Sequence, residues 1–128
     1  MANVPSDLLY TEEHEYLKGT GDDTYQVGIT DYAQGELGDI VYVELPNVGD
    51  KFARMDVFGT VEAVKAVSDL YCPVAGEVVE VNSGLANDPS VVNSDPYGAG
   101  WMIKLRVSGS EELDQLLGPN EYEQHLGK

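Results

Sequence analysis

Apolar and polar residues alternate along much of this chain, as they do in β-strands that bury one face. In residues 24–29, for example, Tyr25, Val27 and Ile29 fall on the same face. The same kind of pattern predicts strands over residues 14–18, 24–29, 40–45 and 101–107. The last of these strands presents Trp101, Ile103, Leu105 and Val107 to one side. The sequence therefore predicts a mostly β protein.

Residues 58–69 predict two short strands that meet at a tip formed by Val64 and Lys65. Tight hairpins usually turn on Asn-Gly or Asp-Gly, and neither pair occurs here. Valine and lysine are poor turn residues, so we infer a chemical reason for the lysine. We expect its amine to be held out on a rigid support and acylated by a cofactor.

Residues 38–43 and 76–81 resemble each other, since each segment starts with glycine and an acid and continues as a predicted strand. A loop follows each copy, at residues 47–50 and 82–85. The lysine hairpin lies between the copies. Two similar halves around a hairpin predict a sandwich or flattened barrel with approximate twofold symmetry, although chance similarity between two β segments is the alternative.

Two helices are predicted to cover the strands. Thr30 is a good N-cap for residues 31–37, where Ala33 and Leu37 share one face, and Gly38 fits the end of that helix. A second helix is expected near residues 110–117. Ser110 would cap this helix, leucines would line one of its faces, and Gly118-Pro119 would end it. A last helical turn over residues 120–126 would pack Tyr122 and Leu126 against the rest of the protein.

The remaining segments are expected to lack regular structure. Residues 6–10 form a lead-in, and residues 85–100 form a loop in which Val91 and Val92 pair briefly as a strand.

The length of 128 residues predicts one domain, residues 1–128, with a real core. No apolar run approaches the roughly 20 residues of a membrane helix, and residues 1–10 lack a signal-peptide pattern. A processed organellar protein would look the same. We expect a monomer that works in a bacterial cytoplasm or, in a processed eukaryotic protein, in the mitochondrial matrix.

The charge is strongly acidic, with 23 acidic against 7 basic residues and a net charge of −16. Nucleic acids and anionic membranes require clusters of Lys and Arg, and the sequence contains none. Acidity favours partners with basic docking faces, and it is equally explained by solubility.

No motif for nucleophilic catalysis or phosphate binding occurs, so the chain is not expected to be an enzyme. Cys72 is the only cysteine, which favours a reducing compartment and a packed, unreactive side chain. His14 is interpreted as a satisfied strand histidine. Asp22 and Asp23 lack the further oxygen ligands of a calcium loop, so no metal site is expected.

Residues 61–69, V-E-A-V-K-A-V-S-D, resemble the lipoyl-attachment motif of the glycine cleavage system H protein family. The resemblance extends over nearly the whole chain; the one departure noted is Tyr16, where the family usually has tryptophan. The other matching segments are residues 13–16, 28–34, 37–39, 43–46, 73–78, 81–82 and 100–102.

This resemblance implies a barrel-sandwich hybrid, the flattened barrel of two antiparallel sheets shared by lipoyl and biotinyl carriers. It also implies a carrier of glycine catabolism and one-carbon metabolism, with lipoic acid joined to Lys65 by an amide through a lipoylating enzyme. The swinging arm would take an aminomethyl group from glycine decarboxylase (P protein, pyridoxal phosphate) to aminomethyltransferase (T protein, tetrahydrofolate). Dihydrolipoamide dehydrogenase (L protein, FAD) would then reoxidise it.

In this family the loaded arm folds into a cleft, and the matching positions are Glu15, Ile29, Ala33 and Leu37, with Ala66 and Asp69 near the tip. Glu15 is interpreted as the acceptor for the aminomethyl ammonium, against the alternative that it is one more solvated acid. Glu62 and Asp69 flank the tip, where the lipoylating enzyme would recognise them unless they are plain solvated charges.

Three other functions remain open from the sequence. A biotinyl carrier is disfavoured because methionine normally stands on both sides of its lysine, where this chain has Val64 and Ala66. A lipoyl-relay protein of the same family would donate lipoate. In an unmodified interaction module, Lys65 would serve solubility alone.

Overall fold

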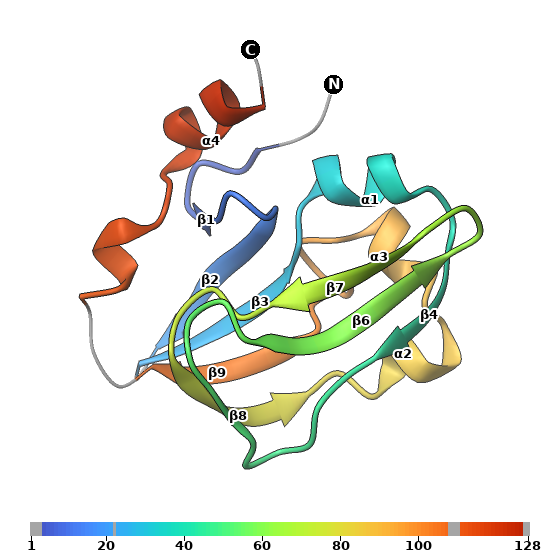
Figure 1. Cartoon of the computed structure of the whole chain (residues 1–128), viewed down its shortest axis with the longest axis horizontal. Helices are drawn as coiled ribbons and strands as arrows, with labels where there is room; N and C mark the ends of the chain where they lie inside the picture. Colours follow the sequence, from blue (N-terminus) through green and yellow to red (C-terminus); the bar gives the residue numbers. More distant parts are fainter. Residues whose placement is uncertain (1–3, 22, 108–110, 127–128) are drawn as a thin grey trace.

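The computed structural model describes residues 4–21, 23–107 and 111–126, and it is built mainly of short antiparallel strands (Figure 1). The strands are β1 Leu9–Tyr10, β2 Glu15–Gly21, β3 Thr24–Ile29, β4 Ile40–Glu44, β5 Lys51–Phe52, β6 Val57–Ala63, β7 Val67–Tyr71, β8 Gly76–Val81 and β9 Ile103–Val107. The helices are α1 Asp31–Leu37, α2 Gly84–Asn87, α3 Val91–Ser94, α4 Pro119–His125 and the 3₁₀ turn η1 Leu113–Gln115.

The strands form two antiparallel sheets, one in the order β1-β2-β3-β9-β8-β5 and the other in the order β4-β6-β7. Their facing sides bury one hydrophobic cluster to which both sheets contribute, including Val27 and Leu105 from the first sheet and Val61 from the second. This arrangement confirms the prediction of a mostly β barrel-sandwich fold.

The predicted strand faces explain this core. Val27 and Ile29 are buried on β3, as period-two alternation requires, and Tyr25 is half-buried. On β9 the buried positions include Ile103 and Leu105, whereas Trp101 precedes the strand and is only partly covered.

Helix α1 matches its prediction at both ends. The hydroxyl of Thr30 accepts a hydrogen bond from the amide of Ala33 at 3.2 Å. Gly38 follows the helix with φ of 80° and donates its amide to the carbonyl of Gln34. These two caps fix both the length and the direction of the helix.

The two similar segments of the sequence become β4 and β8, which lie in different sheets. Their following loops turn through equivalent backbone hydrogen bonds, from Asp50 to Asn47 at 3.1 Å and from Leu85 to Asn82 at 3.2 Å. The internal duplication itself stays a prediction.

Several predicted element boundaries are wrong. Residues 9 and 10 form β1, and β2 begins at Glu15 because His14 has φ of 72°, outside the extended region. The segment 85–100 contains helices α2 and α3, and Val91 and Val92 belong to α3 and not to a strand. These single helical turns are too short to show a periodic pattern in the sequence.

The helix predicted near residues 110–117 is also wrong in the part that the structure describes; Ser110, its predicted cap, lies outside that part. Only the turn η1 forms, because Leu117 exchanges two backbone hydrogen bonds of 2.8 Å with Tyr10. Pro119 begins α4, where its fixed φ and missing amide are tolerated. Tyr122 and Leu126 pack on the body as predicted.

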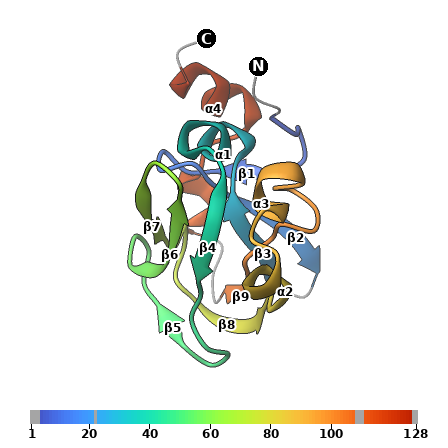
Figure 2. The same cartoon turned by 90° about the vertical axis from the view of Figure 1, so that its right-hand side faces the viewer.

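Helix α4 covers β1 at one end of the molecule, beside α1 (Figure 2). None of the helices in the described ranges is both long enough and apolar enough to span a membrane.

Candidate functional site

Strands β6 and β7 form the predicted hairpin around Lys65. They pair as far as Glu62 and Val67, and the amide of Ala63 donates to the carbonyl of Ala66 at 2.7 Å. The three residues between the strands, 64–66, are exposed. The amide of Val64 donates to the carbonyl of Asp39 at 3.0 Å, which ties the tip to the segment after α1. The lysine thus stands on a support that is hydrogen-bonded on two sides.

The side chain of Lys65 extends across the end of α1. A Cβ placed on Gly38 would lie 3.2 Å from Cε and 3.8 Å from Nζ of this lysine. Leu37, the residue before Gly38, lines the cleft described next. The amine therefore starts close to one wall of that cleft.

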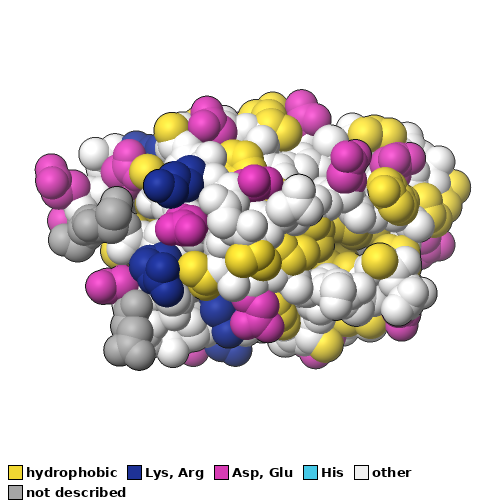
Figure 3. Space-filling view, turned by 90° about the horizontal axis from the view of Figure 1, so that it is seen from below, with side chains coloured by type: hydrophobic (Ala, Val, Ile, Leu, Met, Phe, Trp, Pro, Cys, Tyr) yellow, Lys and Arg dark blue, Asp and Glu magenta, His cyan; other side chains and the backbone are white. Residues whose placement is uncertain are grey.

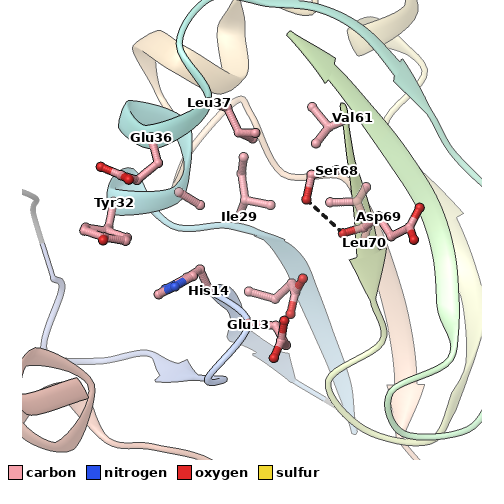
Figure 4. A pocket seen from close by; sticks show the side chains of 12 residues that line it. Glu13, His14, Ile29, Tyr32, Glu36, Leu37, Val61, Ser68, Asp69 and Leu70 are labelled. Atoms are coloured by element: carbon pink, nitrogen blue, oxygen red, sulfur yellow. Dashed lines mark hydrogen bonds between the residues drawn. The ribbon is translucent and has the colours of Figure 1, made fainter. Parts of the chain in front are cut away.

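A cleft of about 290 Å³ opens between α1, the start of β2 and the lysine hairpin (Figure 4). It contains all four predicted arm-cleft residues, Glu15, Ile29, Ala33 and Leu37, together with Asp69. Glu62 and Ala66 flank the tip and do not line the cleft. The lining residues that the sequence interpretation did not name for the cleft are Glu13, His14, Tyr32, Glu36, Val61, Ser68 and Leu70.

The missed residues follow from the register of the strands. Val61 pairs with Ser68, and this pair faces the cleft from the hairpin. Alternation within the hairpin would have assigned Val61 to the inner face. The approach of Tyr32 and Glu36 depends on how α1 is rotated over the sheet, for which the sequence carries no local signal.

Glu15 is an acid in the interior, with 2% of its surface exposed, and not a solvated charge. Thr11 donates its hydroxyl to Oε1 at 2.9 Å, and the amide of Tyr71 donates to Oε2 at 3.2 Å. Burial raises the pKa of this carboxyl to about 8, and the hydrogen bonds from Thr11 and Tyr71 oppose the rise. Near neutral pH the group therefore holds a proton that it is able to release.

His14 lies at the rim of the cleft next to helix α4. Its Nδ1 is 2.8 Å from the hydroxyl of Tyr122, and its ring lies 4.9 Å from Tyr32 and 5.6 Å from His125 between centroids. Burial lowers the pKa of His14, and His125 adds to this effect. The prediction of a satisfied histidine agrees with these contacts, although the residue precedes the strand.

Asn93 of α3 holds the turn between α1 and β4. Its Oδ1 accepts from the amide of Ile40, while its Nδ2 donates to the carbonyl of Gly38 and to Oε1 of Gln34, each at 2.9 Å. These bonds fix the backbone over which the stem of Lys65 lies.

Cys72 is fully buried and donates its thiol to the carbonyl of Val74 at 3.1 Å. Burial raises its pKa to about 12, so at neutral pH the nucleophilic thiolate is scarce. Among the described residues, no cluster of three or more His, Cys, Asp or Glu side chains is arranged to hold a metal ion.

On the face shown in Figure 3, acidic side chains are widely spread and basic side chains gather toward one end. Lys51 and Arg106 line a pocket together with Asp23 and Glu77. The lysine tip is not part of that pocket.

Fold and site together define a carrier-type barrel-sandwich domain, with a lysine on a hairpin tip beside a cleft that buries one acid. The comparisons with known proteins identify the family. The family model described as "Glycine cleavage H-protein" matches residues 8–128. The chain therefore belongs to the glycine cleavage H-protein family.

Individual relatives agree with this assignment. The chain is 56% identical to the glycine cleavage system H protein of Carboxydothermus hydrogenoformans, over 98% of this chain and 96% of that protein. It is 57% identical to the glycine cleavage system H protein of Mycolicibacterium smegmatis, over 92% of this chain and 89% of that protein. The crystal structure of a glycine cleavage system H protein from Mycobacterium marinum superposes with a TM-score of 0.88 at 39% identity, covering 98% of this chain and 100% of that chain.

Proposed function

We propose that this protein is the lipoylated shuttle of a glycine cleavage system. In this role it carries the aminomethyl group of glycine on a lipoyl-lysine at Lys65, from the P protein to the T protein, and the L protein restores the disulfide. The bound lipoyl group supplies the dithiolane and its thiol–disulfide chemistry. The chain supplies attachment, presentation and shelter, and is not itself an enzyme.

The observation that carries this proposal is the position of Lys65 beside the cleft. The amine is on an exposed tip that a modifying enzyme is able to reach, and its stem crosses Gly38 directly after the cleft residue Leu37. Amide formation removes the lysine charge, which lowers the cost of placing the arm against apolar walls such as Ile29 and Ala33. The residues present therefore fit a lipoyl group attached at this position.

Glu15 gives the cleft its chemical selectivity. A buried carboxyl that holds a proton near pH 7 is neutral in the empty cleft and becomes ionised when a cationic group comes close. An aminomethyl cargo carries such a positive charge. We infer that Glu15 accepts a hydrogen bond from the ammonium and that the cleft walls keep water from the labile cargo.

The attachment is tested by the intact mass of protein expressed with lipoic acid and a lipoylating enzyme, followed by peptide mapping. We expect one lipoyl group on the peptide that carries Lys65 and none on the Lys65→Arg protein. Lys51→Arg, an exposed lysine on β5, is the matched control and should be modified normally. A chain that stays unmodified while a control carrier is lipoylated would contradict the proposal.

The pathway is tested by reconstitution with P, T and L proteins. We expect the lipoylated protein to support release of CO₂ from glycine and transfer of the one-carbon unit to tetrahydrofolate. A lipoyl-relay protein would be modified at Lys65 and would donate lipoate without supporting these reactions.

The role of Glu15 is tested by the rate at which the loaded protein loses its cargo to hydrolysis. We expect Glu15→Gln to lose the cargo roughly ten- to a hundredfold faster than wild type, because a charge-assisted hydrogen bond contributes about 1.5–3 kcal/mol. Glu13→Gln, at an exposed position also on the cleft rim, is the matched control. An unchanged rate in Glu15→Gln would show that this acid has another role.

We also propose that the lipoylating enzyme recognises Glu62 and Asp69. Glu62 is the last residue but one of β6 and pairs with Val67. Asp69 lies two residues further along β7 and pairs with Thr60. Glu62→Gln and Asp69→Asn should each lower kcat/KM for lipoylation by roughly two- to fivefold. Glu77→Gln, on strand β8 of the other sheet, should leave it unchanged.

A further inference from the structure

Helix α4 contacts the cleft-lining residue His14 through the ring of His125 and, by a direct polar contact, through the hydroxyl of Tyr122. This residue is fully buried, and its hydroxyl lies 2.8 Å from Nδ1 of His14 and 2.7 Å from Oγ1 of Thr30. His14 precedes Tyr122 by 108 residues and Thr30 precedes it by 92, so the contact is made only in the folded chain.

The two partners of this hydroxyl belong to two segments that each contribute a wall of the cleft. Thr30 caps α1, the helix that contributes Ala33 and Leu37 to the lining. His14 lies directly before β2 and its buried Glu15, and its side chain is itself part of the lining. The amide of Thr30 also donates to the carbonyl of His14 at 3.0 Å. A displacement of Tyr122 would therefore act on both walls together.

The ring of Tyr122 is held in place independently of these bonds. It stacks on Tyr10 with 4.6 Å between centroids and 7° between planes. Tyr10 in turn exchanges backbone hydrogen bonds with Leu117, just before α4. A phenylalanine at position 122 would keep this stacking and would lose only the hydroxyl.

A second tyrosine supports the same end of α1. The hydroxyl of Tyr97 accepts a hydrogen bond from the amide of Asp31 at 2.9 Å. The first turn of α1 is therefore fixed from two directions, by α4 and by the segment after α3. Tyr122 also contacts His14.

We propose that Tyr122 is a positioning residue of the arm cleft, whose hydroxyl sets the spacing between α1 and the start of β2 by binding Thr30 and His14 together. This inference rests on the proposed function in so far as the cleft shelters the aminomethyl cargo. It assigns to the C-terminal helix a role in carrying cargo, in addition to covering the core.

The first test uses the unmodified protein, in which amide hydrogen exchange is followed by NMR. In Tyr122→Phe we expect the amides of Thr30 and Ala33 to exchange roughly three- to tenfold faster, as expected for the loss of about one buried hydrogen bond. The amides of the β6–β7 hairpin should be unchanged. Tyr10→Phe is the matched control, because it also loses a buried-ring hydroxyl, one that donates to the carbonyl of Pro5 and does not bind the cleft walls.

The second test measures hydrolytic loss of the cargo from lipoylated, loaded protein, with the free energy of unfolding determined in parallel. We expect roughly three- to tenfold faster loss in Tyr122→Phe and wild-type loss in Tyr10→Phe. If the two variants behave alike in both tests, Tyr122 contributes only to stability and the inference is wrong.

The two proposals fail in different ways. Wild-type protein that loses its cargo as fast as unfolded protein would overturn sheltering by the cleft, and the exchange test on unmodified protein would still decide the role of Tyr122. If wild-type protein protects its cargo from hydrolysis, and Tyr122→Phe matches wild type in both amide exchange and cargo loss, the positioning role alone would be overturned.

Discussion

The stem of Lys65 lies across Gly38, so that a Cβ on this glycine would come within 3.2 Å of the lysine Cε. Gly38 has φ of 80° and ψ of −155°, a region that only glycine occupies without strain. The same residue therefore ends α1 and leaves room for the lysine side chain. A single position thus links the shape of the cleft to the start of the carrier arm.

Replacing Gly38 by alanine should lower the free energy of unfolding by about 1–3 kcal/mol because of this backbone conformation. Gly35→Ala is the matched control: Gly35 lies within α1, and a Cβ there would meet no atom within 4 Å. Alanine at that position should raise stability by about 0.5–1 kcal/mol. Urea denaturation of the two proteins measures both changes, and effects of the same sign would contradict the prediction.

The carboxyl of Glu15 should make stability depend on pH. Its pKa rises from 4.5 to about 8 on folding, so the folded state binds more protons than the unfolded state between these values. The stabilisation from this group is complete below about pH 4.5 and falls as pH rises toward 8.

The measurement compares wild type with Glu15→Gln from pH 5 to pH 8. We expect the unfolding free energy of wild type, relative to that of the variant, to fall with pH by at most about 1.4 kcal/mol per unit. Glu13→Gln is the matched control, because it also removes one acid but at an exposed position. Parallel stability curves for wild type and Glu15→Gln would show that Glu15 does not change its protonation on unfolding in this range.

Asn93 should be among the most sensitive polar positions. Asn93→Ala removes its three hydrogen bonds at the α1–β4 turn and leaves the amide of Ile40 without that partner, so we expect a loss of about 1–3 kcal/mol. The neighbouring exposed Ser94, changed to alanine, should cost less than about 0.5 kcal/mol. Thermal denaturation distinguishes the two, and equal effects would mean that the turn is held by its backbone alone.

Cys72 should resist alkylation in the folded protein. Its burial and a thiol pKa of about 12 leave little thiolate at pH 8. We expect iodoacetamide to leave folded, unmodified protein unlabelled for hours and to label it rapidly in urea, as followed by intact mass. Rapid labelling of the folded protein would reveal an opening of the core that exposes this residue.

The strands and the first helix were predictable because their signals are local. Alternation placed Val27 and Ile29 in the core, and the pair Thr30 and Gly38 bounded α1 correctly. The C-terminal segment was not predictable in this way, because its leucines fit a helical stripe while the backbone of Leu117 pairs with Tyr10. A partner more than a hundred residues away overrode the local preference.

For the site, the sequence alone identified Lys65, the hairpin that presents it and the residues that match the H-protein family. These features could be recognised because they depend on neighbouring residues and on a motif. Tertiary structure decided that Glu15 is buried, that His14 and Ser68 line the same cleft, and that Tyr122 joins its two walls. These facts depend on how the two sheets and helices α1 and α4 pack, because burial and hydrogen bonding between distant segments arise only when the chain is folded.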